Sequence, residues 1–282
     1  MTALLFDARG ETPNTRAPPP PGKAASPRDY ISFSAIRTYQ QCPLRYFFRY
    51  IAGIPEETIS AALVFGSAIH RAIEHHFRML LESRTASTQE EMLREYQSEW
   101  QAQSLPVRFS KDEQADSFDD LAKRMLSAFA QSDLAKPPGR ILAIEESLRG
   151  ELVPGLPDLL GKVDLILESP SELLVTDWKT SRAKFTQDQV DESAAQLLLY
   201  GELAKDFAPG KRLRLQFGVL TKTKEVSVDI HSFSFEQPSL DRTKRVIERV
   251  WHAIESEHFY PAPSLMNCPG CPYRDPCRKW PG

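Results

Sequence analysis

The chain has 282 residues, of which 41% are hydrophobic and 26% are charged, as in an ordinary globular protein. This length allows one large domain or two small ones with a substantial core. The formal net charge of −3 excludes an overall basic surface, which would indicate a nucleic-acid partner. It does not exclude local basic patches on one face of the protein.

No apolar run reaches the about 18 residues that a membrane span needs. No Gly-x4-Gly-Lys-Ser/Thr motif occurs, so we expect no helicase motor within the chain. Residues 1–29 are rich in proline, alanine and polar residues and include the run Pro18–Pro21, which predicts a disordered tail. This segment lacks the apolar centre of a signal peptide, so we expect a cytoplasmic protein with no membrane contact.

The ordered chain is predicted to begin near Tyr30, with a helix that Ser32 caps. The next segment, 42–50 (CPLRYFFRY), mixes aromatic residues with Arg45 and Arg49. Such a mixture can form a nucleic-acid platform, because bases stack on aromatic rings and arginine binds phosphate. Aromatic residues at helical spacing are more often buried, so the two arginines are the better candidates for nucleic-acid contact.

The strongest helical pattern covers Ala61–Leu81, where apolar residues recur every three or four positions. The expected buried stripe consists of Leu63, Ile69, Ile73, Phe77 and Leu80. His70 lies one position off this stripe, where a histidine is more often structural than a metal ligand. Two further helices are predicted at about Glu90–Gln101 and Ala115–Gln131, without a chemical motif.

A sheet is predicted to begin after the Pro-Pro-Gly break that ends at Gly139. Its first strand, Ile141–Leu152, contains Glu145 and Glu146. Glu145 is a candidate third acid near a metal site, but the alternation does not decide which glutamate points inward. A solvated edge strand is an equal alternative for both.

The stretch 161–180 (GKVDLILESPSELLVTDWKT) predicts two strands joined by a Ser-Pro-Ser turn. Residues two apart on a strand share a face, so Asp177 and Lys179 point one way and Trp178 the other. A hairpin pairing would bring Asp164 close to Asp177. Two carboxylates and a lysine at the end of a sheet can bind a hard divalent cation and place a water beside it.

A helix is predicted over about Gln189–Asp206, and it carries Gln196 and Tyr200 on one face. Each of the two can have a purely structural role. Beyond this helix the patterns predict a hairpin of two strands, Lys211–Thr221 and Glu225–Phe235. An amphipathic helix is predicted to follow over residues 237–257. The basic residues Arg212, Arg214, Lys222 and Lys224 can face phosphate, but a solvated edge guarded by lysine is the commoner meaning.

Three of the four cysteines form a C-x2-C-x5-C pattern, Cys268, Cys271 and Cys277, and Cys42 is the fourth. Four soft ligands with none to spare indicate one four-coordinate metal centre. Two disulfides are the alternative, which a cytoplasmic location disfavours. Zinc and an iron–sulfur cluster both fit four thiolates, and the spacing by itself slightly favours zinc.

In their order along the chain, these motifs resemble the RecB-like branch of the PD-(D/E)XK nuclease superfamily, including its AddB-type and CRISPR-associated members. The resemblance covers about residues 30–280 and rests on four motifs: F-G-x-x-x-H ending at His70, G-x-V-D ending at Asp164 with D-x-K-T from Asp177, Q-x-x-x-Y from Gln196, and the split cysteines. It implies a restriction-endonuclease-like α/β fold, with a central mixed sheet flanked by helices, a helical N-terminal region and a cysteine-rich C-terminal staple.

The resemblance also implies roles for individual residues. Asp164 and Asp177 would bind Mg²⁺ or Mn²⁺, with His70 and the backbone carbonyl of Trp178 as further ligands, and Lys179 would orient or deprotonate a water. Gln196 and Tyr200 would support the catalytic strand and the DNA backbone. Cys42, Cys268, Cys271 and Cys277 would hold a structural 4Fe–4S cluster rather than zinc.

The resulting hypothesis is a metal-dependent DNA nuclease, an exonuclease on single-stranded or end-exposed DNA, in repair and recombination or in CRISPR spacer processing. The alternative is a non-catalytic DNA-binding partner of a helicase or a CRISPR integration complex, and a third possibility is a zinc-stapled protein without nuclease activity. The expected organisation is a tail (1–29), a helical region (30–138), a nuclease core (139–260) and an iron–sulfur segment (261–282).

Overall fold

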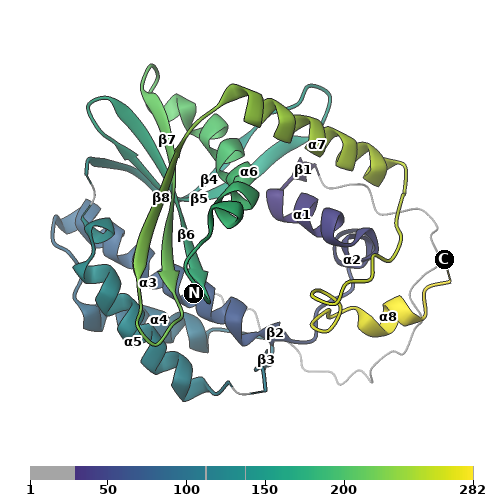
Figure 1. The fold of residues 1–282 in the computed structure, drawn as a ribbon, viewed down its shortest axis with the longest axis horizontal. Helices are drawn as coiled ribbons and strands as arrows, with labels where there is room; N and C mark the ends of the chain where they lie inside the picture. Colours follow the sequence, from purple (N-terminus) through teal and green to yellow (C-terminus); the bar gives the residue numbers. More distant parts are fainter. Residues whose placement is uncertain (1–28, 112, 137, 282) are drawn as a thin grey trace, which may run out of the picture.

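A six-stranded sheet forms the centre of the computed structural model, which describes residues 29–111, 113–136 and 138–281 (Figure 1). The predicted disordered tail lies outside these residues, apart from Asp29. The strands are β1 (Tyr30–Ile31), β4 (Arg140–Gly150), β5 (Asp158–Glu168), β6 (Glu172–Ser181), β7 (Arg212–Thr221) and β8 (Val228–Ser234). Their order is β1-β5-β6-β7-β8, with β4 also paired to β5. The β6–β7 pair is parallel and the β4–β5, β5–β6 and β7–β8 pairs are antiparallel, so the predicted mixed sheet is confirmed.

Helices cover both faces of the sheet, as expected for the predicted fold class (Figure 1). One hydrophobic core joins the sheet to α1 (Phe33–Gln41), α6 (Gln187–Ala204) and α7 (Gln237–Glu255). A second core joins the other face to α3 (Ala61–Ser83), α4 (Gln89–Gln101) and α5 (Ala115–Gln131). Among the described residues, no helix is both long and apolar enough to cross a membrane.

Polar side chains fix where the main helices begin. Ser32 and Ser60 accept hydrogen bonds from backbone N–H groups in the first turns of α1 and α3. Thr88 and Thr186 form capping boxes at the starts of α4 and α6, so the first-turn donors of these helices are satisfied locally. The predicted buried stripe of α3 is wrong at Leu63, which is 60% exposed because Ala61, Val64 and Phe65 form the buried face of this turn instead.

Strands β5 and β6 separate partway along their length. β6 pairs with β5 from Leu165 to Glu168, and β1 pairs with the same edge of β5 at Asp158 and Leu159. Residues 160–164 of β5 therefore run along this edge without a paired strand. We call this opening, between residues 160–164 of β5 and 177–181 of β6, the fork.

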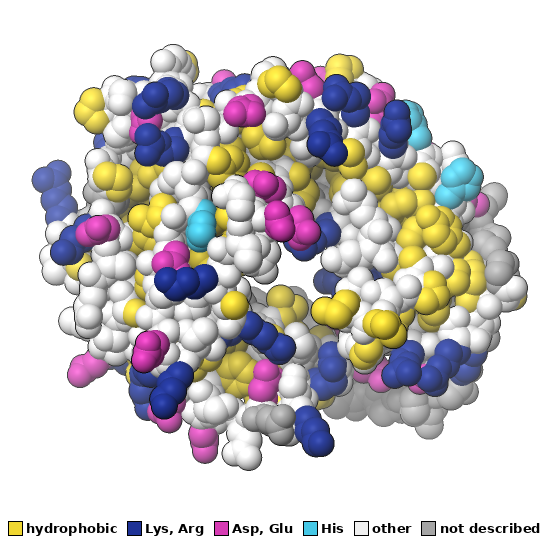
Figure 2. Space-filling model, viewed as in Figure 1, with side chains coloured by type: hydrophobic (Ala, Val, Ile, Leu, Met, Phe, Trp, Pro, Cys, Tyr) yellow, Lys and Arg dark blue, Asp and Glu magenta, His cyan; other side chains and the backbone are white. Residues whose placement is uncertain are grey.

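The two ends of the described chain meet beside the sheet. α2 (Pro43–Tyr46) and the π-helical turn Phe47–Ile51 pack against the segment around α8 (Arg274–Arg278). The two-residue strands β2 (Ile59–Ser60) and β3 (Val107–Arg108) pair below them. In Figure 1 these elements, α3 and the sheet lie around an open middle, and the space-filling view shows the molecule hollowed there (Figure 2).

Candidate active site

The fork places the two predicted aspartates next to each other. The β5–β6 register, Leu165 opposite Thr176, makes Asp164 and Asp177 the first positions beyond the paired part of the hairpin. The Oδ2 atom of Asp164 accepts a hydrogen bond from the backbone N–H of Trp178 at 2.7 Å. The Asp164 carboxylate thus bridges the two strands where the backbone ladder has stopped, which holds it at a fixed position.

Helix α3 and strand β4 bring two more ligand types to the fork. His70 Nδ1 lies 3.5 Å from Asp164 Oδ2. His70, Glu145 and Asp164 each offer a ligand atom, and these atoms lie within 4.8 Å of one another. Glu145 points inward with a side chain only 11% exposed, whereas Glu146 is exposed, so the structure decides the question that the alternation left open.

Helix α6 covers the other side of the fork. Gln196 donates to Asp177 Oδ1 at 3.2 Å and accepts from Lys179 Nζ at 3.1 Å. It also donates to the Tyr200 hydroxyl at 3.1 Å. The Lys179 ammonium lies 2.6 Å from Asp177 Oδ2. One glutamine side chain therefore orients the aspartate and the lysine of the D-x-K pair together.

The Tyr200 ring fills the part of the fork that lacks a strand. A Cβ atom on Gly161 would approach this ring to 2.5 Å, so only glycine leaves room for it. The Tyr200 hydroxyl also bonds the backbone of Lys162, which satisfies part of the unpaired strand edge. Burial raises the pKa of Tyr200 to about 12, so its hydroxyl stays protonated at neutral pH.

The site concentrates negative charge. Burial raises the pKa of Asp164 well above its usual value, and the neighbouring charges of Asp177 and Glu145 raise it further. Burial lowers the pKa of His70, although the same two carboxylates partly offset this, so the imidazole is neutral at pH 7 and free to act as a ligand. The backbone of Trp178 also raises the pKa of His70, and the Trp178 carbonyl stays a predicted metal ligand.

The donor set fits a hard divalent cation. It consists of carboxylate oxygens and one imidazole, with no sulfur. Asp177 Oδ2 is buried and accepts no hydrogen bond of good geometry from any described residue, despite its contact with Lys179. His70, Glu145 and Asp164 are the residues that converge, and Asp177 stays a predicted ligand from the adjacent strand.

The sequence motifs assigned no role to Lys162, and they included Gly161 only as the glycine of G-x-V-D. Lys162 Nζ forms an ion pair with Glu145 Oε2 at 2.5 Å, so it supplies the cation nearest to that glutamate. The Tyr200 ring packs directly against Gly161. A glycine inside a strand pattern signals a close approach of another group, so Gly161 could have been recognised, whereas nothing in the sequence pairs Lys162 with Glu145.

The four predicted cysteine ligands come together at the meeting of the two chain ends. All four are free thiols; Cys268 is exposed and Cys42, Cys271 and Cys277 are partly buried. Burial raises the pKa of Cys277, and the charges of the other three cysteines raise it further. We call these cysteines, with the aromatic cluster of Phe47, Phe48, Tyr273 and Trp280 beside them, the staple.

The predicted arginine contacts differ from each other. Arg49 forms an ion pair with Glu56 at 3.2 Å and lies over the Tyr50 ring. Arg45 has a buried Nε atom that bonds no described residue. Tyr46 and Phe47 are buried, so the interpretation of these aromatics as core residues is confirmed.

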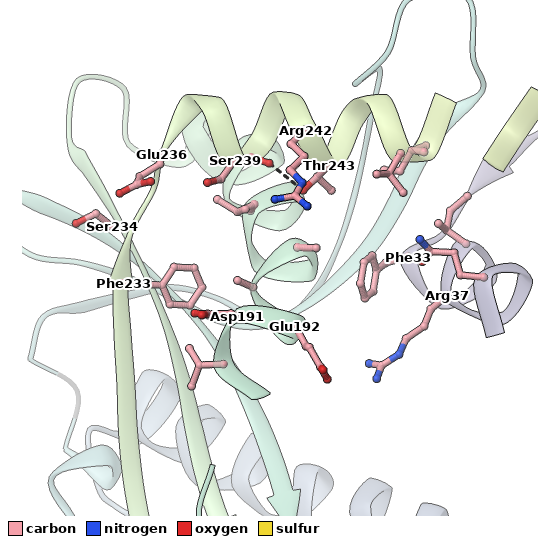
Figure 3. Close-up of a pocket in the computed structure, with 18 of the residues that line it drawn as sticks. Phe33, Arg37, Asp191, Glu192, Phe233, Ser234, Glu236, Ser239, Arg242 and Thr243 are labelled. Atoms are coloured by element: carbon pink, nitrogen blue, oxygen red, sulfur yellow. Dashed lines mark hydrogen bonds between the residues drawn. The ribbon is translucent and has the colours of Figure 1, made fainter. Parts of the chain in front are cut away.

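A cavity of about 950 Å³ lies away from the fork, between α1, α6, α7 and β8 (Figure 3). Phe33 and Phe233 line it, with Arg37, Arg242, Asp191, Glu192 and Glu236 at its rim. The metal-ligand group at the fork takes no residue from this lining. We therefore place the chemistry at the fork rather than in this cavity.

Comparison with known protein families identifies the family to which the chain belongs. A model of the PD-(D/E)XK nuclease superfamily matches residues 30–278. The chain belongs to the PD-(D/E)XK nuclease superfamily. Membership implies a phosphodiester hydrolase that uses divalent metal ions, which agrees with the acidic group at the fork.

One solved structure shares this fold. A putative exonuclease from Eubacterium rectale is similar over 89% of this chain and 88% of its own, with a TM-score of 0.58 and 15% sequence identity. The protein SSO0001 aligns over 85% of this chain and 92% of its own, with a TM-score of 0.36 and 14% identity. No curated protein sequence matches the chain.

Proposed function

We propose that this PD-(D/E)XK protein is a Mg²⁺- or Mn²⁺-dependent deoxyribonuclease that degrades single-stranded DNA from a free end. The observation that carries the proposal is the fork, where His70, Glu145 and Asp164 converge beside the Asp177–Lys179 pair. A divalent cation bound there would supply charge to the scissile phosphate and lower the pKa of a water.

The chain's own residues would do the rest. Asp164, fixed by the Trp178 N–H, and neutral His70 would hold the cation, with Asp177 and the Trp178 carbonyl as further ligands. The Lys179 ammonium, held by Gln196, would orient the attacking water and offset the charge that develops on the phosphate. Tyr200 would keep Gln196 in place.

The central hollow supports the requirement for a free end (Figure 2). The chain on its far side runs from β1 through α1 and α2 to β2 and α3. It is anchored at both ends, because β1 pairs with β5 and α3 packs on the sheet. A ring closed by the covalent chain cannot open without losing this packing, so a strand would enter by threading its end.

A second part of the proposal is that the staple holds a 4Fe–4S cluster. Four thiolates around one zinc ion lie about 3.8 Å apart, given Zn–S bonds of about 2.3 Å. No three of these sulfur atoms, all of which are described, group within 4.8 Å as the ligands at the fork do. The wider arrangement favours a larger cluster over a single zinc ion, and iron and sulfide analysis of anaerobically purified protein tests it.

The deciding experiment compares linear and circular single-stranded DNA of one sequence, with Mg²⁺ or Mn²⁺. We expect degradation of the linear form, resistance of the circle, and no degradation of either by Asp177→Asn. Equal degradation of the circle would overturn the free-end requirement. If wild type and Asp177→Asn were equally inactive on both forms, the non-catalytic DNA-binding alternative would replace the nuclease.

The wider role that we propose is DNA repair and recombination or CRISPR spacer processing, with a helicase or CRISPR integration protein as partner. A helicase would supply the single strand that a threading nuclease needs. Copurification of a partner with tagged full-length protein tests this part.

A further inference from the structure

A half-buried lysine beside the fork makes no ion pair within 4.0 Å with any described residue, and the carboxylate whose charge acts on it, Glu113, pairs with Arg182. Lys222 follows β7, and its backbone N–H donates to Ser181 O at 2.6 Å, which fixes it beside the end of β6, two residues after Lys179. Its ammonium lies over the Phe65 ring at 5.2 Å. Phe65 itself is fully buried, so this ring is a rigid support.

The other cations nearby are paired. Arg182 lies 3.7 Å from Glu113, and Lys184 lies 3.6 Å from Asp229. Among the described residues, no carboxylate oxygen comes within 4.0 Å of Lys222 Nζ, and the ammonium makes no hydrogen bond. Removing an unpaired charge from water is costly, so such a lysine is typical of a site that an anion completes.

Lys222 also lies at a useful distance from the chemistry. Phe65 precedes His70 by five residues on α3, a rise of about 7.5 Å along the helix axis. A strand of helical DNA advances about 3.4 Å along the helix axis per phosphate, so this rise equals about two such steps, and an extended single strand covers it in fewer. Gly66 lies between them, and a Cβ atom there would be 3.5 Å from Thr180 Oγ1, so α3 and β6 are in close contact at this point.

The arginines of the same hairpin serve as a contrast. Arg212 and Arg214, at the opposite end of β7, both pair with Glu172, so their charge is already neutralised. The rim of the cavity between α1, α6, α7 and β8 carries acidic as well as basic residues, which is unfavourable for a polyanion (Figure 3). Lys and Arg side chains also lie on the lower rim of the central hollow (Figure 2).

We propose that Lys222 binds a backbone phosphate of the DNA one or two nucleotides from the scissile phosphate, on the α3 side of the fork. This inference rests on the proposed nuclease function. It makes Lys222 a substrate-positioning residue, which holds the strand so that the next phosphates reach the metal site.

The test measures binding of a fluorescent single-stranded oligonucleotide over a range of salt concentrations, in EDTA and again in Ca²⁺. We expect Lys222→Gln to weaken binding about 5- to 10-fold at low salt, through loss of one charged phosphate contact. The slope of log K against log salt concentration should fall by about 0.7, the value for one phosphate on a single strand.

Lys224→Gln is the matched control. Lys224 is an exposed lysine in the same turn, and this substitution removes the same charge as Lys222→Gln. It should bind like wild type, and Lys222→Arg should restore most of the affinity. The metal-induced rise in melting temperature should persist in Lys222→Gln, which shows that the fold and metal site are intact.

Two results would overturn the assignment. An unchanged slope in Lys222→Gln, or an equal change in Lys224→Gln, would show that Lys222 contacts no particular phosphate. Both results are distinct from failure of the nuclease proposal, in which wild type itself does not cleave DNA.

Discussion

The fork and the staple both unite residues from distant parts of the chain, but they hold them differently. At the fork, hard oxygen and nitrogen donors sit on long elements, and backbone and side-chain hydrogen bonds fix Asp164 and Asp177. In the staple, Cys42 ends α1, Cys268 and Cys271 lie in the loop before α8, and Cys277 lies in the five-residue helix α8, beside an aromatic cluster. The fork is preorganised for a reaction, whereas the staple joins the two ends of the fold.

The difference predicts that damage at the fork removes activity and spares the fold, and that damage at the staple does the reverse. Tyr273 is buried in the staple and donates its hydroxyl to Ile54 O at 3.2 Å, so the aromatic packing retains part of the connection without the cysteines. Four experiments test this contrast.

The largest effect is expected at the D-x-K pair. Asp177→Ala or Lys179→Ala should lower the cleavage rate by about 10³-fold or more, because each removes charge that stabilises the transition state. Circular dichroism and gel filtration should match wild type. Cleavage that survives in both variants would exclude the proposed mechanism.

At the staple, Cys277→Ser should lower the free energy of unfolding by about 3 kcal/mol, because a cross-link over a long loop restricts the unfolded chain. This corresponds to a fall in melting temperature of about 6–12 °C. The measurement is thermal unfolding of anaerobically purified protein, with iron content in parallel. A cluster-loaded variant with unchanged melting would show that Cys277 is not a ligand.

A third prediction concerns the stability that the metal-free protein loses because the Asp164 carboxylate is buried beside other carboxylates. The pKa of Asp164 is higher in the folded protein than in the unfolded chain, where it is about 4. The metal-free protein is therefore more stable below about pH 4, and it loses this stability as the pH rises through the pKa of Asp164 in the folded state. Asp164→Asn keeps an acceptor for the Trp178 N–H and should abolish this loss, which stabilises the metal-free protein at pH 7 by about 1 kcal/mol.

The same variant should lose the rise in melting temperature that Mn²⁺ gives to wild type, since one ligand is gone. Unfolding in EDTA and in Mn²⁺ at several pH values checks both effects. If Asp164→Asn were less stable than wild type in EDTA, the ionised Asp164 would not destabilise the metal-free protein.

The smallest effect is expected at the support of the fork. Tyr200→Phe removes the hydroxyl that bonds Gln196 and the Lys162 backbone, and it should cost about 1 kcal/mol of stability and about 3- to 10-fold in rate. Tyr260→Phe is the control, because Tyr260 is 57% exposed. Equal rates for the two variants would assign Tyr200 a packing role alone.

Local sequence patterns determined much of this protein. The apolar alternation and the Ser-Pro-Ser turn predicted the β5–β6 hairpin, and its register places Asp164 beside Asp177. The capping residues and apolar periodicity located the main helices to within a few residues. These features depend on neighbours in the chain, so periodicity and turn chemistry carry them.

Tertiary structure decided the rest. The register of β4 shifts between Ile141 and Ala143, and Glu145 has a φ of +53°, so simple alternation could not show that Glu145 rather than Glu146 turns inward. The parallel pairing of β1 with β5, the ion pair of Lys162 with Glu145 and the solitary Lys222 all join segments far apart in sequence. Such contacts depend on how whole elements pack, which no local pattern encodes.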